Sequence, residues 1–292
     1  MFITLTGKLG SGKSTVAKLI QKDYGYEIYS TGTVQRSLAE KMGITTLELN
    51  KRMKEDPSYD HVIDDETTRL SEEKMGENIL FDSRLAFHFV RESFKVFAYV
   101  SPYEAADRVM GADRGSVEHY QNREDARNQL LERSRVENER FGDIYHLNNL
   151  DYDNYNLIID TTWVSPAEVE TELMRVLGLY QENPNLKLLC FSPKSVYPLK
   201  ACADLDIEKE AEAEQCLKAG KPLEPVKLIY DGVFHYVAEG METVAAALKL
   251  GINYVTCVMA EDGLKIPAHV SLGDYETLGG FTYKDIPGLY EK

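Results

Sequence analysis

The sequence predicts an α/β protein in which a parallel sheet is covered by helices, followed by a smaller α+β domain. Three observations lead to this prediction. The chain has 292 residues, more than the roughly 100–200 residues of a single domain. Short apolar runs alternate with helical patterns over residues 1–180, which is typical of a parallel sheet. A polar connector then leads into a segment in which a β-hairpin is expected.

The first element is the apolar, β-rich run Phe2–Thr6, which a glycine-rich segment, Gly7–Ser14, and a helical pattern, Thr15–Lys22, follow at once. Residues 7–14 have the form G-x-x-x-x-G-K-[ST], and the strand and helix on either side are those that a phosphate-binding loop requires. The N–H groups of such a loop and the helix N-terminus bind phosphate oxygens. This motif predicts ATP and Mg²⁺ as cofactors, with the nucleotide bound by Gly7, Gly10, Ser11, Gly12, Lys13, Ser14 and Thr15.

Two of these side chains have more specific expected roles. Lys13 is expected to reach the β- and γ-phosphates, and the Ser14 hydroxyl is expected to contact Mg²⁺. Asp82 ends a later apolar run and is expected to orient the same ion through water. The predicted metal-site residues are therefore Ser14 and Asp82.

Four further strands are expected in the first part of the chain. They are the short apolar runs Glu27–Ser30, Asn78–Asp82, Lys95–Val100 and Asn156–Asp160, each separated from the next by a helical pattern. Helical crossovers make neighbouring strands parallel and cover both faces of the sheet. Because ligands of such sheets bind beyond the carboxyl ends of the strands, side chains that follow these runs are candidates for function.

Arginines occupy such positions and recur on a later helix. Arg36 and Arg84 each follow a predicted strand, while Arg133 and Arg140 are seven residues apart, which places them on one helix face. A guanidinium binds phosphate bidentately and keeps its proton, and phosphoryl transfer depends on such neutralisation of charge. With Lys13, these four arginines are the predicted catalytic residues.

Surface ion pairs are the alternative for these arginines. Several carboxylates lie near Arg133 and Arg140 in the sequence, among them Glu132, Glu137 and Glu139. An exposed pair of this kind contributes only about 0–1 kcal/mol to stability, and it has no catalytic consequence.

Five further features carry a resemblance to a known family. They are Tyr29–Arg36, Glu55–Asp64, Ile79–Ala86, Arg133 together with Arg140 and Phe141, and Tyr155–Thr161. Together with the glycine-rich loop they make residues 1–177 resemble a small P-loop nucleoside monophosphate kinase, most closely the archaeal-type cytidylate kinases. Three positions depart from the family pattern: Gln35, Asp65 and Asn148.

The resemblance implies ATP-dependent phosphoryl transfer to a small acceptor, most closely a pyrimidine nucleoside monophosphate. It implies that Arg36 and Arg84 bind the acceptor phosphate and that Arg133 and Arg140 belong to a lid. Two alternatives stay open: a P-loop kinase of another small metabolite, and a nucleotide-sensing regulatory protein with weak turnover.

The second part of the chain begins after a connector at Gln181–Asn185. Strands are expected at Leu186–Phe191, Val226–Tyr230, Phe234–Ala238 and Tyr254–Met259, and helices at Asp206–Ala219 and Thr243–Leu250. The dipeptide Asp231-Gly232 between two alternating runs is a strong hairpin signal. The glutamates of the first helix are expected to form a solvated face. We therefore expect two domains, residues 1–180 and 184–292, and we expect the first to keep its activity when the second is deleted.

The order of elements after the connector resembles the ParB/sulfiredoxin-like domain. Gly220–Val226 and Glu239–Ala247 occupy the places of its recurrent motifs, but Glu242 and Thr243 stand where that family has two arginines. In the family those arginines contact phosphates, which a glutamate would repel. A degenerate module for interaction, regulation or dimerisation is therefore favoured, so a homo-oligomer or a protein partner through this domain is expected. An independent ligand site is the alternative.

Composition limits the classes of partner. The net charge of −15 argues against a broad surface for nucleic acid or for an anionic membrane. No apolar run approaches the roughly 20 residues that span a bilayer. The four cysteines contain no CxxC pair and the N-terminus has no export-type pattern, so reduced thiols and a cytoplasmic location are expected.

Overall fold

The computed structural model describes residues 1–31, 41–44, 52, 56, 58–111, 120–198 and 205–260 of the chain. Its contacts divide the chain into two compact units whose segments alternate along the sequence. The first unit consists of Met1–Ala98, Glu132–Ile158 and Val169–Lys187, and the second of Tyr99–Leu131, Ile159–Glu168 and Leu188–Lys292. This division differs from the expected boundary at residues 181–183, because the second unit also contains segments of the first 180 residues.

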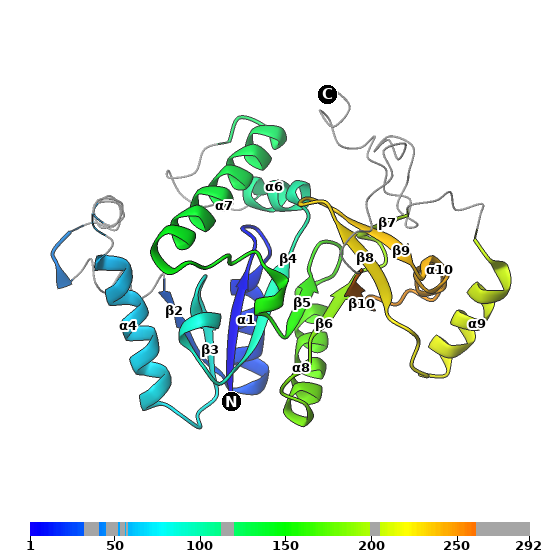
Figure 1. Ribbon diagram of the computed structural model, residues 1–292, viewed down its shortest axis with the longest axis horizontal. Coiled ribbons are helices and arrows are strands. Elements are labelled where there is room, and N and C mark those ends of the chain that lie inside the picture. The colour runs from blue at the N-terminus through cyan, green and yellow to red at the C-terminus, as the bar shows by residue number, and fades with distance from the viewer. Residues whose placement is uncertain are drawn as a thin grey trace. The chain divides into compact units, whose positions relative to one another are not determined.

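The predicted parallel strands of the first unit are present in the structure (Figure 1). The strand β1 (Phe2–Gly7) lies between β3 (Ile79–Asp82) and β4 (Ser93–Tyr99), and β2 (Glu27–Ser30) pairs with the other edge of β3. All three pairings are parallel. The strand β5 (Leu157–Asp160) follows β4 in the strand order. Every residue of β1 is buried, as expected for the central strand of a covered sheet.

Helices of the first unit cover this sheet. The helix α1 (Lys13–Tyr24) packs on β1, β2 and β3 through Val16, Ala17 and Ile20. The helix α4 (Ser58–Glu73) packs against the short α5 (Ala86–Phe89), and a cluster around Phe2 and Phe81 joins them to the sheet. The remaining helical elements are α7 (Arg123–Tyr145), the 3₁₀ turn η2 (Tyr152–Asn154) and α8 (Pro166–Glu182).

The helix α8 shows why the connector is shorter than expected. Val169, Leu173, Val176 and Leu177 are buried, at the spacing of one helix face. The helix continues to Glu182, so residues 181 and 182, which were expected in the connector, belong to it. The connector therefore begins at residue 183.

The second unit contains a mixed sheet with the strand order β6-β10-β8-β9-β7. Its strands are β6 (Leu188–Phe191), β7 (Val196–Pro198), β8 (Val226–Tyr230), β9 (His235–Glu239) and β10 (Val255–Met259). The β10–β8 and β7–β9 pairs are parallel, while β10–β6 and β8–β9 are antiparallel. The predicted hairpin is confirmed: an Asp231 carboxylate oxygen accepts from the N–H groups of Val233 and Phe234, and Gly232 has a φ of 98°.

The helices of the second unit are α6 (Pro102–Gly111), the first part of α7, α9 (Ile207–Lys218) and α10 (Met241–Lys249). Asp206 caps α9 by accepting from the N–H groups of Glu208 and Lys209. The expected solvated face of α9 is wrong at Glu210, which is buried and forms an ion pair with Lys249 of α10. The α9–α10 contact shields this carboxylate.

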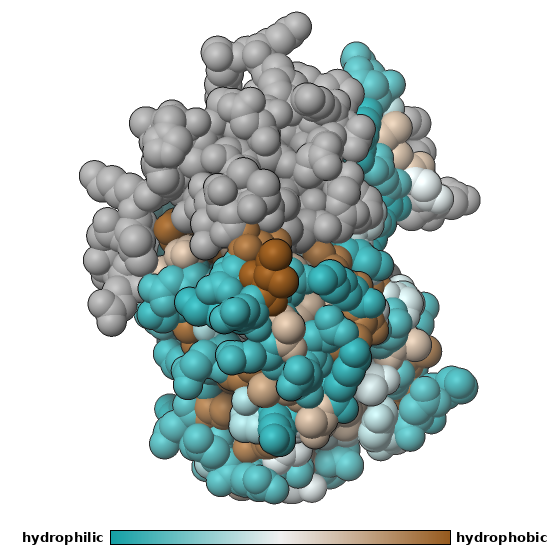
Figure 2. All heavy atoms as spheres, turned by 90° about the vertical axis from the view of Figure 1, so that its right-hand side faces the viewer, coloured by the Kyte–Doolittle hydropathy of each residue, from teal (hydrophilic) through white to brown (hydrophobic). Residues whose placement is uncertain are grey.

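On the face that Figure 2 shows, the described residues are mainly hydrophilic, with small apolar areas between them.

Two buried residues connect the early and late segments of the second unit. The Tyr99 hydroxyl donates to the carbonyl of Val233 at 2.9 Å, and its ring lies 5.4 Å from that of Phe191. Asp160 is fully buried; its carboxylate accepts from the N–H of Ser192 at 3.2 Å and its carbonyl accepts from the Tyr254 hydroxyl at 2.9 Å. The core of this unit therefore depends on residues from both sides of the expected boundary.

Among the described residues, three of the cysteines, Cys190, Cys216 and Cys257, are free thiols. In the same part of the chain, we find no helix with both the length and the apolar character needed to cross a bilayer.

Candidate active site

The glycine-rich loop connects β1 to α1 in a conformation that needs its glycines. Gly7 has a φ of 151°, and a Cβ atom at this position would lie 2.3 Å from the carbonyl oxygen of Ala98 in β4. Gly10 and Gly12 have φ values of 78° and 76°, in the left-handed region that favours glycine. Gly12 is also the N-cap of α1. The loop thus places the N-terminus of a helix where phosphate is expected.

The Lys13 ammonium lies against this loop. It donates to the carbonyl oxygens of Gly7 at 3.1 Å and Lys8 at 3.0 Å, and to the Ser11 hydroxyl at 3.4 Å. Ser11 is itself buried. These contacts hold the positive charge of Lys13 at the loop that is predicted to bind phosphates.

The two predicted metal-site residues are adjacent. The Ser14 hydroxyl donates to a carboxylate oxygen of Asp82 at 3.2 Å. Asp82 is the last residue of β3, and its register partners are Leu5 of β1 and Ser30 of β2. The carboxyl ends of three parallel strands thus converge beside the loop. A hydroxyl and a carboxylate are oxygen donors of the kind that Mg²⁺ prefers, so the residues present fit that ion.

Arg84 follows β3 and reaches the same loop. Its Nη1 donates to the Gly7 carbonyl at 2.6 Å, the carbonyl that also accepts from Lys13. Its Nη2 lies 3.5 Å from a carboxylate oxygen of Glu137, and 25% of its side chain is exposed. Arg84 is therefore not a solvated surface arginine.

The two predicted lid arginines have different surroundings. The Arg133 Nε donates to Glu137 at 3.0 Å, so Glu137 contacts both Arg133 and Arg84. Arg140 lies over the ring of Phe141, with its guanidinium carbon 5.4 Å from the ring centre. The structure thus brings Lys13 and Arg84 together at the Gly7 carbonyl, and Glu137 connects Arg84 to Arg133. For Arg140, the contact described is the one with its neighbouring aromatic ring.

Arg36 lies outside the described residues, so its predicted role stays a prediction. Another arginine, Arg108 of α6, has a structural role: it donates to the carbonyl oxygens of Thr161 at 2.6 Å and Thr162 at 3.0 Å, and pairs with Glu104.

One pair near the site was not expected from the sequence. The Tyr145 hydroxyl, at the end of α7, donates to the carboxylate of Asp64 in α4. The rings of Phe89 and His61 lie edge-on to Tyr145, at 5.5 and 5.6 Å. Asp64 is buried. No local signal reveals this contact, because the two residues are far apart in the sequence.

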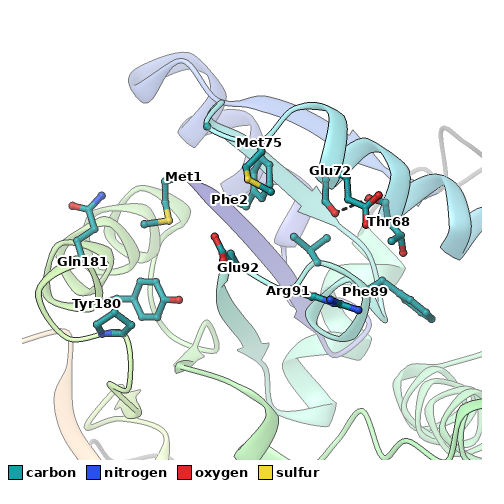
Figure 3. A pocket seen from close by; sticks show the side chains of 14 residues that line it. Met1, Phe2, Thr68, Glu72, Met75, Phe89, Arg91, Glu92, Tyr180 and Gln181 are labelled. Carbon is teal, nitrogen blue, oxygen red and sulfur yellow. Dashed lines mark hydrogen bonds between the residues drawn. The ribbon is translucent and has the colours of Figure 1, made fainter.

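A cavity of about 800 Å³ lies elsewhere in the first unit (Figure 3). Phe2, Met75, Val90 and Tyr180 are among its lining residues. Phe2 begins β1 and Gly7 ends it, so at about 3.3 Å per residue the cavity and the loop are about 17 Å apart along the strand. The cavity is therefore separate from the phosphate-binding loop.

Comparison with known proteins gives one family match. Residues 2–163 match the model of the cytidylate kinase-like family. The cytidylate kinase of Natronomonas pharaonis is 33% identical over 182 residues, which are 62% of this chain and 91% of that protein. The cytidylate kinase of Thermoplasma volcanium is 34% identical over 173 residues, 58% of this chain and 87% of that protein.

A longer relative and a solved structure are also similar. The S-adenosylmethionine-dependent nucleotide dehydratase of Lacinutrix mariniflava is 38% identical over 168 residues, 57% of this chain. The match spans only 34% of that protein's length. The shikimate kinase of Bacteroides thetaiotaomicron has a TM-score of 0.46 and 16% identity, over 62% of this chain and 98% of that one. The family match ends at residue 163, and these comparisons do not support the expected ParB/sulfiredoxin-like resemblance of residues 184–292.

Proposed function

Because the chain belongs to the cytidylate kinase-like family and is a kinase-type phosphotransferase, we propose that it transfers the γ-phosphoryl group of ATP to a pyrimidine nucleoside monophosphate such as CMP. Two relatives that it matches over most of their length are cytidylate kinases. The longer relative is named for a reaction of a nucleotide, which supports a nucleotide as the ligand class.

One observation carries this proposal. The ammonium of Lys13 and the guanidinium of Arg84 donate to the same carbonyl oxygen, that of Gly7. Lys13 is the cation expected on the donor phosphates, and Arg84 is the cation expected on the acceptor phosphate. Phosphoryl transfer requires both phosphates in line with charge neutralised around the moving group. Two cations that meet at one turn of the loop suit that requirement.

The remaining residues have roles that follow from their chemistry. The N–H groups of the loop would bind the ATP phosphates. When bound, Mg²⁺ would be held by Ser14 and Asp82, and it would neutralise phosphate charge. We propose that Arg36 acts with Arg84 on the acceptor phosphate. Arg133 and Arg140 would close over the γ-phosphoryl group and exclude water, which would otherwise hydrolyse ATP.

A coupled assay of ADP release, run with CMP, dCMP, UMP, AMP and small non-nucleotide metabolites, tests the proposal. We expect turnover with a pyrimidine monophosphate. Turnover only with a non-nucleotide acceptor would instead identify a metabolite kinase. ATP binding with little turnover on every acceptor would identify a nucleotide-sensing regulator.

The acceptor role of Arg84 has its own test. In Arg84→Ala we expect the acceptor KM to rise about tenfold or more, because a bidentate phosphate contact is lost, while ATP affinity changes less than about threefold. Arg69→Ala is the matched control, since Arg69 is half-exposed and pairs only with Glu66 and Glu73 of its own helix among the contacts described. An equal loss of ATP affinity in Arg84→Ala would place Arg84 on the donor side.

For the segment after the connector we propose a role in interaction or regulation. Glu242 supports this choice over phosphate binding. Its carboxylate lies 3.4 Å from the N–H of Asp206, at the start of α9, and would repel a phosphate there. Native mass spectrometry of the full chain would report whether it forms a homo-oligomer.

A further inference from the structure

Glu137 of α7 contacts two arginines that come from different elements. Its Oε1 accepts from the Nε of Arg133, one helical turn earlier, at 3.0 Å. Its Oε2 lies 3.5 Å from the Nη2 of Arg84, which follows β3. The other end of the Arg84 guanidinium donates to Gly7. A continuous set of contacts therefore runs from the phosphate-binding loop through Arg84 and Glu137 to Arg133.

This carboxylate differs from its neighbours on α7. Glu132 and Glu139 both pair with Arg135, and all three side chains are more than half exposed. The Glu137 side chain is only 22% exposed, and Arg84 is similarly shielded. Water and salt screen a shielded pair less than an exposed one. The contact of Glu137 with Arg84 is thus a stronger candidate for a functional role than the solvated pairs that Arg135 forms on this helix.

Electrostatics explains why a carboxylate is needed at this position. Lys13 and Arg84 share one carbonyl, and Arg133 is joined to Arg84 through Glu137. Three cations gathered to bind phosphates repel one another before the phosphates arrive. A carboxylate with one oxygen directed to each arginine compensates part of this charge and fixes the direction of both guanidinium groups.

We infer that Glu137 is a positioning residue for phosphoryl transfer, which holds Arg84 and Arg133 in the arrangement that receives the phosphates. The inference rests on the proposed function. It also gives α7 a defined connection to the loop, so that the lid arginine Arg133 and the acceptor arginine Arg84 are placed as one unit. Such placement acts mainly on the transition state, in which both phosphates must be aligned.

The first test is Glu137→Gln, which keeps the shape of the side chain and removes its charge. We expect kcat to fall about tenfold or more, with the KM for ATP changed less than about threefold. The control is Glu132→Gln on the same helix, whose partner Arg135 is solvated; its kcat is expected to stay within about twofold. Equal kcat values for the two variants would overturn the inference.

Two further variants separate positioning from a purely structural role. Glu137→Asp retains the charge. Its kcat is expected to be at least about threefold higher than that of Glu137→Gln, even where both variants have a lower melting temperature than the wild type. In an Arg133→Ala, Arg84→Ala background, Glu137→Gln is expected to cost less than about twofold, because residues that act together are not additive. No recovery by Asp, or a full tenfold loss in the double-arginine background, would contradict the role given to Glu137.

The same measurements distinguish failure of the proposed function. A wild-type chain without turnover on any nucleoside monophosphate would overturn the proposed function, and the role of Glu137 with it. A wild-type chain that turns over while Glu137→Gln is unaffected would overturn the role of Glu137 alone.

Discussion

A chain that ends at Asn183 is expected to be strongly destabilised. The sequence suggested that residues 1–180 act alone, but the second unit combines Tyr99–Leu131 and Ile159–Glu168 with the segment that starts at Leu188. Deleting residues 184–292 removes the strands β6, β7, β8, β9 and β10. Tyr99 and Asp160, which are at most 2% exposed, would lose their surroundings.

The size of the effect follows from the hydrogen bonds and ring packing that the deletion removes. Four of the hydrogen bonds that disappear lie within the second unit: Tyr99 to Val233, Ser192 to Asp160, Tyr254 to Asp160 and Asn253 to Glu168. At about 1 kcal/mol each they contribute about 4 kcal/mol. The rings of Phe191 and His235, 5.4 and 4.7 Å from Tyr99, add about 1 kcal/mol each. The loss of about 6 kcal/mol is comparable to the total stability of a typical domain, about 5–15 kcal/mol.

Urea unfolding of the truncated and full-length chains, with phosphoryl-transfer activity measured on the same samples, checks this expectation. In the full-length protein, Tyr99→Phe removes the hydroxyl that bonds to Val233 but keeps the ring, and it is expected to lower the free energy of unfolding by about 1 kcal/mol. Tyr99→Ala also removes the ring and is expected to cost about 3–5 kcal/mol. Tyr24→Phe is the control, because Tyr24 is 47% exposed. A fragment 1–183 with the stability and turnover of the full chain would refute the reasoning and support the boundary expected from the sequence.

Three other predictions concern single residues. Lys13→Ala is expected to lower kcat about 10²–10³-fold, because the positive charge that faces the phosphates is lost; the melting temperature is expected to fall slightly, because Lys13 holds the loop carbonyls. Exposed Lys18 provides the control, and activity of Lys13→Ala within twofold of wild type would contradict the donor-site assignment. Gly7→Ala is expected to lower the free energy of unfolding in urea by several kcal/mol, since its Cβ would lie 2.3 Å from the Ala98 carbonyl oxygen. Gly76→Ala is the control: it has open space around it and is expected to cost only about 1 kcal/mol for its positive φ, so similar losses for both variants would be inconsistent with this packing. Burial raises the pKa of Asp160 above its ordinary value of 3.8, so the folded state binds this proton more tightly than the unfolded state. Stability therefore falls as the pH rises from 3.8 through the folded-state pKa. The free energy of unfolding of Asp160→Asn should lack this decline, and parallel curves of variant and wild type against pH would contradict the role of Asp160.

Local sequence was sufficient to predict the phosphate-binding loop and the strands around it. Gly7, Lys13 and Ser14 are close in the chain, and their geometry follows from a strand, a tight turn and a helix in succession. Asp82 and Arg84 could be placed beside them because parallel strands end at one edge of a sheet. In the structure Ser14 contacts Asp82 and Arg84 contacts Gly7, while the roles assigned to these side chains stay predictions. The role of Arg36 lies outside the described residues and stays a prediction.

Tertiary structure alone decided which helix contacts complete the site and where the units divide. Glu137 had the spacing of an ordinary surface partner for Arg133, and its second contact, with Arg84, depends on how α7 packs. The pairing of Tyr145 with Asp64 and the ion pair of Glu210 with Lys249 are decided in the same way. The polar connector suggested two independent domains, yet Tyr99 and Asp160 are buried by residues that lie far along the chain. Periodicity and turn residues report which face a local segment can bury, but the partner that covers that face is chosen by packing between distant segments.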